Sequence, residues 1–120
     1  MNVGVLGLAH GHVNAYCQRW GAEPDLNIRV AAAWDADNGR LKEGAERFGF
    51  AACASLDDLL KQNIDAVIIA SETVYHAEHV EKAARAGKAI VLQKPISLSL
   101  EDANRIVDVI TKTGVAFTMA

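Results

Sequence analysis

One turn near the N-terminus has part of the glycine spacing that binds phosphate: residues 3–16 read VGVLGLAHGHVNAY. Gly7 ends an apolar run, as the first glycine of a dinucleotide-binding fingerprint does. Ala9 and His12 stand where that fingerprint has its other two glycines, with an extra glycine, Gly11, between them. The N–H groups at the start of the following helix attract phosphate whatever the side chains are. We therefore expect a phosphate-binding turn that the Ala9 methyl group and the His12 ring make narrower.

An acidic side chain follows the second apolar run of the chain, in a position suited to a ribose. Asp35 ends that run, and a carboxylate there can accept hydrogen bonds from both hydroxyls of an adenosine ribose. The same charge repels a 2′-phosphate, so the sequence favours NAD over NADP as the cofactor. Arg40 is a nearby positive charge that weakens this preference. In the alternative interpretation, Asp35 only opens a polar turn with Asp37 and Asn38.

Six short apolar runs predict the strands that would position these residues. The run at residues 66–70, AVIIA, is apolar throughout, which is typical of a strand buried on both faces of a parallel sheet. Because helical periods separate the runs, the pattern predicts one doubly wound α/β domain, a Rossmann fold with strand order 3-2-1-4-5-6. The strands are expected at residues 2–6, 28–34, 51–54, 66–70, 89–92 and 115–119.

Five helices are expected between these strands. Ser55 with Asp58, and Ser99 with Asp102, have the spacing of a capping box, in which the serine accepts a hydrogen bond from the start of the helix. The helices are expected at residues 13–20, 41–48, 55–60, 75–86 and 99–113. The predicted inner face of the last helix is formed by Ala103, Ile106, Val107 and Ile110.

One longer segment, residues 66–95, leads from the fourth strand to a Lys-Pro pair. It contains in turn a buried strand, a turn with small hydroxyl residues, a histidine that opens a helix, the tripeptide Ala-Gly-Lys, a further strand and the Lys-Pro pair. This order resembles the family of glucose–fructose oxidoreductase, inositol dehydrogenase and MocA. The resemblance covers nearly the whole chain, as the N-terminal nucleotide-binding domain of that family.

The resemblance implies a role for each part of this segment. The turn after the fourth strand would run beside the ribose and pyrophosphate of the cofactor. Lys94 would be the catalytic residue, approaching the nicotinamide and the reacting hydroxyl, and the lysine–proline peptide is commonly cis in the family. Together with the glycine turn and the end of the second strand, the candidate cofactor-binding residues are Gly7, Ala9, His10, Gly11, His12, Asp35, Arg40, Ser71, Glu72, Thr73, His76, Gln93, Lys94 and Pro95.

The sequence departs from the family pattern at three places. Gln93 stands where the Glu-Lys-Pro signature has glutamate, and Glu72 stands where proline is usual. The third departure is the glycine turn, with Ala9 and His12. A neutral amide at position 93 cannot hold or tune Lys94 as a carboxylate would, so this departure bears directly on catalysis.

As a member of this family, the protein would be an NAD-dependent oxidoreductase. Hydride would pass between the nicotinamide and a hydroxyl carbon of a sugar, polyol or related small molecule. In the family a second domain, absent from this chain, supplies substrate and oligomer contacts, so residues 1–120 alone are expected to bind cofactor without turnover. The competing hypothesis is a non-catalytic Rossmann module that senses or retains a nucleotide.

The four histidines allow a further alternative, a metal site. His10 and His12 follow the first strand, while His76 and His79 follow the fourth, and two or three imidazoles could ligate zinc if they converged. The opposing interpretation is that they are ordinary loop and helix histidines. We predict that no metal is bound.

Composition narrows the choice of partners and compartment. The formal net charge of −3 gives no electrostatic reason to expect nucleic acid or an anionic membrane as a partner. No apolar stretch approaches the roughly 18 residues of a membrane span, and no signal peptide is visible. Cys17 and Cys53 lack the spacing of a metal or redox motif, and we expect two buried thiols in a reducing cytoplasm.

Overall fold

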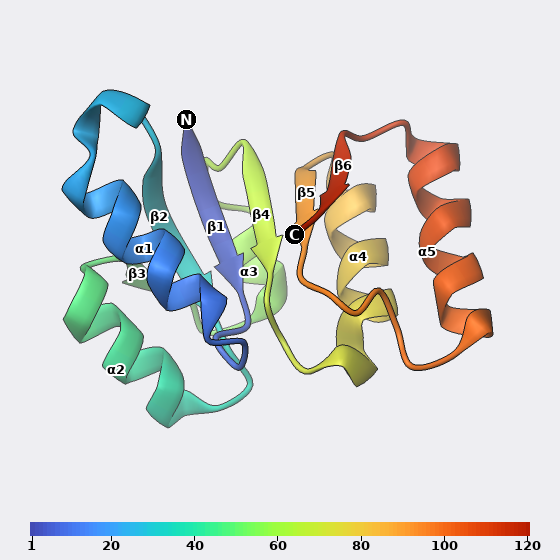
Figure 1. Cartoon of the computed structure of the whole chain (residues 1–120), viewed down its shortest axis with the longest axis horizontal. Helices are drawn as coiled ribbons and strands as arrows, with labels where there is room; N and C mark the ends of the chain where they lie inside the picture. The colour runs from blue at the N-terminus through green and yellow to red at the C-terminus, as the bar shows by residue number, and fades with distance from the viewer.

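The computed structural model describes residues 1–120, which are organised around one sheet of six strands (Figure 1). The strand order is β3-β2-β1-β4-β5-β6, and every neighbouring pair is parallel. The strands are β1 (Asn2–Leu6), β2 (Arg29–Trp34), β3 (Ala51–Ala52), β4 (Ala66–Ile69), β5 (Ala89–Leu92) and β6 (Phe117–Met119). The predicted doubly wound α/β fold and its strand order are confirmed, although β3 and β6 are shorter than expected.

Helices cover both faces of the sheet, with α1 in front of it and α3 behind it in Figure 1. One face is packed by α1 (His12–Ala22) and α2 (Asn38–Phe48). The other is packed by α3 (Leu56–Leu60), α4 (His76–Arg85) and α5 (Leu100–Thr113). Single turns of 3₁₀-helix lie at Pro24–Leu26 and Thr73–Tyr75.

Strand β4 lies inside the sheet and is buried on both faces, as its apolar run predicts. Val67 and Ile69 belong to the core under α3, α4 and α5, whereas Ala66 and Ile68 belong to the core under α1 and α2. Successive strands lead outward from β1 on one side and from β4 on the other. The connections that leave β1 and β4 therefore diverge, and a doubly wound sheet binds its ligands in the crevice at such a point.

The caps of two helices agree with the sequence, but the predicted inner face of α5 is partly wrong. The Ser99 hydroxyl accepts a hydrogen bond from the N–H of Asp102 at 3.1 Å, as expected of the cap. Ile106 is buried, but Val107 is 58% exposed and Val109 is buried in its place. Each helical residue turns about 100° from the one before, which carries Val107 beyond the edge of the face centred on Ile106.

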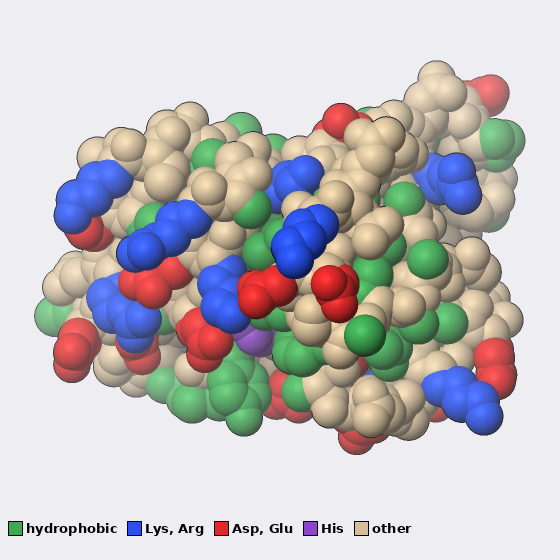
Figure 2. Space-filling model, turned by 180° about the vertical axis from the view of Figure 1, so that it is seen from behind, with side chains coloured by type: hydrophobic (Ala, Val, Ile, Leu, Met, Phe, Trp, Pro, Cys, Tyr) green, Lys and Arg blue, Asp and Glu red, His purple; other side chains and the backbone are tan.

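The surface carries charges of both signs close together. Figure 2 shows Lys and Arg side chains beside Asp and Glu side chains across one face of the molecule. Arg105, for example, contacts both Glu81 at 3.1 Å and Asp102 at 2.9 Å. None of the helices combines the length and the apolar character needed to cross a membrane.

Candidate functional site

The turn after β1 packs directly against the turn after β4. Gly7 has a φ of +85°, and a Cβ atom placed on it would lie 2.4 Å from Cα of Ser71. The N–H of Gly7 donates to the carbonyl oxygen of Trp34 at 2.8 Å, and the N–H of His10 donates to that of Ala70 at 3.0 Å. The tight turn predicted at Gly7 is therefore present, and only glycine fits there without a shift of the backbone.

The start of α1 opens onto this turn. The N-cap residue is Gly11, with a φ of −58°, and no side chain accepts a hydrogen bond from the first turn of the helix. Ala9, Gly11 and His12 are all exposed. The N–H groups of Val13 and Asn14 donate to the carbonyl oxygens of His10 and Gly11 at 3.2 Å, so the N–H groups before them and the helix dipole favour an anion at this end. This is the geometry that the sequence predicts for a phosphate site.

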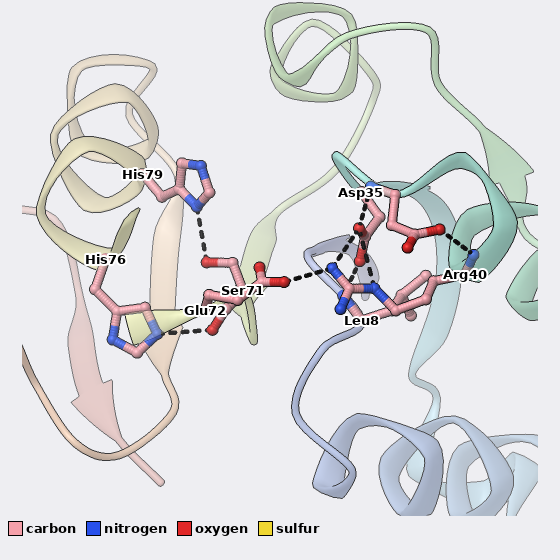
Figure 3. Close-up of polar contacts among 8 residues, drawn as sticks. Leu8, Asp35, Arg40, Ser71, Glu72, His76 and His79 are labelled. Atoms are coloured by element: carbon pink, nitrogen blue, oxygen red, sulfur yellow. Dashed lines mark hydrogen bonds and ion pairs between the residues drawn. The ribbon is translucent and has the colours of Figure 1, made fainter. Parts of the chain in front are cut away.

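Asp35 is buried at the end of β2 and organises the loops around it (Figure 3). One carboxylate oxygen accepts from the N–H of Leu8 at 2.6 Å. The other accepts from the N–H of Asp37 at 2.7 Å and from the guanidinium of Arg40, at 2.9 Å from Nη2 and 3.3 Å from Nε. A carboxylate oxygen has about two acceptor positions, so the oxygen bound by Asp37 and Arg40 is fully used, whereas the oxygen bound by Leu8 keeps one position. The ribose role predicted for Asp35 therefore depends on where Arg40 lies.

A cavity of about 250 Å³ opens beside Asp35, between the ends of β2 and β4. Three aromatic rings meet at its wall. Tyr75 stacks on His79 with 5.8 Å between ring centroids, and Trp34 meets His79 edge-on at 6.1 Å. Trp34, Tyr75 and His79 are not among the cofactor-site residues predicted from the sequence, although Tyr75 and His79 have the i, i+4 spacing that aligns residues on one helix face. A flat, partly apolar ring fits a cavity with such a wall.

His79 is held neutral at pH 7 inside this cavity wall. Its Nδ1 lies 2.8 Å from the hydroxyl oxygen of Ser71. Burial, the largest cause, lowers the pKa of His79 to about 4, with smaller contributions from His76 and Lys82. The ring is therefore a hydrogen-bonding and stacking group at neutral pH rather than a positive charge.

The burial of His79 predicts a specific loss of stability in acid. An unfolded histidine has a pKa of about 6.5, so the unfolded chain binds an extra proton as the pH falls from about 7 to about 4. The stability contributed by neutral His79 is present above pH 6.5 and is lost as the pH falls through the folded pKa of about 4. We expect a loss on the order of 2 kcal/mol, reduced from the full linkage value by solvent screening.

Urea unfolding at a series of pH values, for the parent and for His79→Gln, measures this loss. Glutamine can still hydrogen-bond the Ser71 hydroxyl but does not titrate. The difference between the two stability curves removes the contribution of the carboxylates, which is common to both. Curves that run parallel from pH 7 to pH 4 would contradict the assignment.

His76 connects the two turns of the site. Its Nε2 lies 3.1 Å from the carbonyl oxygen of Ser71, and its Nδ1 lies 3.0 Å from that of Pro95. The ring is 1% exposed, so it lies beneath the site rather than in it. A neutral imidazole donates to one of these carbonyls, whereas an imidazolium donates to both. His76 therefore acts on the site through Ser71 and Pro95. Thr73 opens the 3₁₀ turn that leads from Ser71 into α4.

The Lys94–Pro95 peptide bond is cis, as the family resemblance implies. Lys94 is exposed at the end of β5, and its N–H donates to the carbonyl oxygen of Ala120 at 3.0 Å. The pKa of His10 is lowered by burial first, then by the charges of His12, Lys94 and His76. Because β1, β4 and β5 are parallel neighbours, Lys94 follows β5 at the same edge of the sheet as the turn after β1, and β4 lies between it and β1.

Gln93 is completely buried and contacts α1. Its side-chain N–H donates to the Tyr16 hydroxyl at 3.1 Å, and its side-chain oxygen lies 3.4 Å from Nδ1 of His12. Two departures from the family pattern, at positions 12 and 93, therefore touch each other. The amide is used to hold α1, and no hydrogen bond joins it to Lys94.

The four histidines do not come together as one cluster of metal ligands. His76 and His79 are engaged by Ser71 and Pro95, while His10 and His12 lie with their ring centroids 4.7 Å apart. No group of three or more His, Cys, Asp or Glu side chains lies close enough to hold a metal ion.

A 3-2-1-4-5-6 parallel sheet, a glycine turn leading into α1 and an acidic residue at the end of β2 define a dinucleotide-binding Rossmann domain. The family model for oxidoreductases with an NAD-binding Rossmann fold matches residues 1–120. The chain therefore belongs to this family. This is the glucose–fructose oxidoreductase, inositol dehydrogenase and MocA family expected from the sequence.

The chain is similar to sugar and polyol enzymes of this family. It is 30% identical over 115 residues to dTDP-3,4-didehydro-2,6-dideoxy-alpha-D-glucose 3-reductase of Streptomyces violaceoruber, covering 95% of this chain and 33% of that one. It is 33% identical over 111 residues to D-apiose dehydrogenase of Paraburkholderia graminis, covering 89% and 28%. The crystal structure of apo scyllo-inositol dehydrogenase from Lactobacillus casei superposes with a TM-score of 0.84 at 25% identity, covering 100% and 36%. The chain thus spans about a third of the length of these proteins.

Proposed function

We propose that this chain binds NAD for an oxidoreductase that transfers hydride to or from a hydroxyl carbon of a sugar, polyol or related small molecule. The observation that carries the proposal is the Gly7 turn packed on Ser71 beside the cavity that contains Asp35. This edge of the sheet offers a separate place for each part of one dinucleotide. The start of α1 suits the pyrophosphate, the aromatic cavity suits the adenosine, and the crevice near Lys94 suits the nicotinamide.

The residues of this chain have distinct tasks in that reaction. The nicotinamide ring supplies the hydride acceptor or donor. Lys94 holds a proton at Nζ, where it can donate a hydrogen bond to the substrate oxygen or, when neutral, accept the hydroxyl proton. Gln93 and His76 position the backbone on either side of Lys94, through Tyr16 and through the Pro95 carbonyl. Further catalytic and substrate-binding groups would come from a second domain, which would also make the contacts of a homo-oligomer.

The proposed location is the cytoplasm. Cys17 and Cys53 are both free and buried, which suits a reducing compartment. Burial raises the pKa of the Cys17 thiol to about 11, which keeps it protonated and unreactive.

Gln93 favours a second candidate function, a Rossmann module that retains a nucleotide without catalysis. Its amide is used by Tyr16 and His12, so Lys94 has no carboxylate partner at this position. Turnover by the full-length protein separates this candidate from the enzyme.

A negative charge introduced at the start of α1 tests whether the pyrophosphate of NADH binds there. We expect the parent to bind NADH at one saturable site, and His12→Asp to bind it at least about tenfold more weakly. An aspartate at the first helical position stabilises the helix but repels a pyrophosphate, so the loss would not reflect unfolding. Fluorescence titration with NADH gives both affinities.

The matched control is Gln18→Asp, which adds the same charge at an exposed position further along α1. It should change the NADH affinity by less than about twofold, because a charge beyond the first turn is screened. Absence of saturable NADH binding by the parent would contradict the proposed function. Equal losses in the two variants would contradict only the placement of the pyrophosphate.

A further inference from the structure

Arg40 joins the turn after β2 to the turn after β4 across the adenosine end of the site. Its Nη2 lies 2.9 Å from an oxygen of Asp35 and 2.6 Å from an oxygen of Glu72. Figure 3 shows the guanidinium between the two carboxylates. Asp35 and Glu72 both border the aromatic cavity, so the guanidinium lies beside the proposed ribose position.

The two carboxylates that contact Arg40 differ in what else they do. Asp35 is 1% exposed at its side chain and also binds the N–H groups of Leu8 and Asp37, so it is part of the framework. Glu72 is 43% exposed at its side chain, and Arg40 is the only other residue with which its carboxylate forms a hydrogen bond. The hydrogen bond from Arg40 is the largest cause that lowers the pKa of Glu72, and the same two carboxylates raise the pKa of Arg40. The Glu72 carboxylate is therefore a charged group whose partner is Arg40.

A guanidinium beside the ribose is the group that recognises a 2′-phosphate, through charge-assisted hydrogen bonds. The Arg40 guanidinium already binds an anion, because its Nη2 donates a hydrogen bond to the Glu72 carboxylate. Building on the proposed function, we propose that Glu72 is a specificity-determining residue, which occupies Arg40 as an internal competitor of the 2′-phosphate and so disfavours NADP. NAD, which has no phosphate there, does not have to displace Glu72.

Removing the charge of Glu72 should therefore open the site to NADP. We expect Glu72→Gln to bind NADPH about tenfold more tightly than the parent, because Arg40 becomes available to the phosphate. The ratio of the NADPH affinity to the NADH affinity should therefore rise by about tenfold. Adding Arg40→Met to Glu72→Gln should abolish the gain, since the phosphate then has no guanidinium to bind. Fluorescence titration of each variant with NADPH and NADH measures all of these affinities.

Glu78→Gln is the matched control, because Glu78 also lines the cavity but forms no ion pair with Arg40. Its effect on NADPH gives the gain caused merely by removing a negative charge nearby, and we expect less than about threefold. An unchanged NADPH affinity in Glu72→Gln, a gain equal to that of Glu78→Gln, or a gain that survives Arg40→Met would each overturn the inference. Absence of NADH binding by the parent would overturn the proposed function, and the inference with it.

Discussion

Replacing Lys94 by methionine is expected to lower kcat of the full-length protein by about 10² to 10⁴-fold, while the affinity for NADH stays within about threefold. Methionine keeps much of the length of the side chain but cannot hold a proton at its end. Lys94 is exposed after β5, at the same edge of the parallel sheet as the turn after β1, which is where we expect the substrate. Formation of NADH from NAD and a panel of inositols and aldoses gives kcat, and fluorescence titration gives the affinity.

Lys61→Met is the control for this experiment, since Lys61 is exposed at the end of α3 and forms no ion pair. It should leave kcat and NADH affinity unchanged. If Lys94→Met kept the parent kcat, Lys94 would not be the catalytic residue. Should the parent bind NADH without turning over any of these substrates, the result would favour the nucleotide-retaining module that Gln93 suggests.

Replacing Gly7 by alanine is expected to destabilise the fold by about 3 kcal/mol or more and to abolish NADH binding. Two costs add at this position. The φ of +85° is unfavourable for a residue with a side chain, and the new Cβ would lie 2.4 Å from Cα of Ser71 and 2.5 Å from its nitrogen. Backbone atoms cannot turn aside as the end of a flexible side chain can, so the turns after β1 and β4 would have to separate. Urea unfolding measures the destabilisation.

Gly87→Ala separates the two costs. Gly87 also has a positive φ, +72°, but a Cβ atom there would meet nothing within 4 Å. We expect this variant to lose only about 1 kcal/mol, the cost of the backbone conformation, and to bind NADH normally. Similar losses in the two variants would show that contact with Ser71 is unimportant.

The features that follow from local patterns were predictable from the sequence. The uninterrupted AVIIA run placed β4 inside the sheet because a strand covered on both faces has no polar side. The capping serines placed the starts of α3 and α5 because a serine hydroxyl can accept from the N–H three residues later. Gly7 was identified because a tight turn after the first strand needs a conformation that other residues avoid.

The parts of the site that depend on distant contacts could not be predicted in this way. Arg40 and Glu72 are far apart in the sequence, and only the arrangement of two loops brings them to 2.6 Å. The contact between His12 and Gln93 likewise depends on how α1 lies against the end of β5. The prediction that Val107 lies on the inner face of α5 was wrong for a different reason. An apolar residue near the edge of a helical stripe is buried only if a neighbouring element covers it. Periodicity alone contains no information about that neighbour.

The ring of His76 has a mechanical consequence for the protein. An imidazole has no rotatable bond between its two nitrogens, and each nitrogen faces a backbone carbonyl, Ser71 on one side and Pro95 on the other. The ring is therefore a spacer of fixed length between the loop that borders the aromatic cavity and the loop that carries Lys94. Because covalent geometry sets this span, we expect a displacement of one loop to shift the other loop as well.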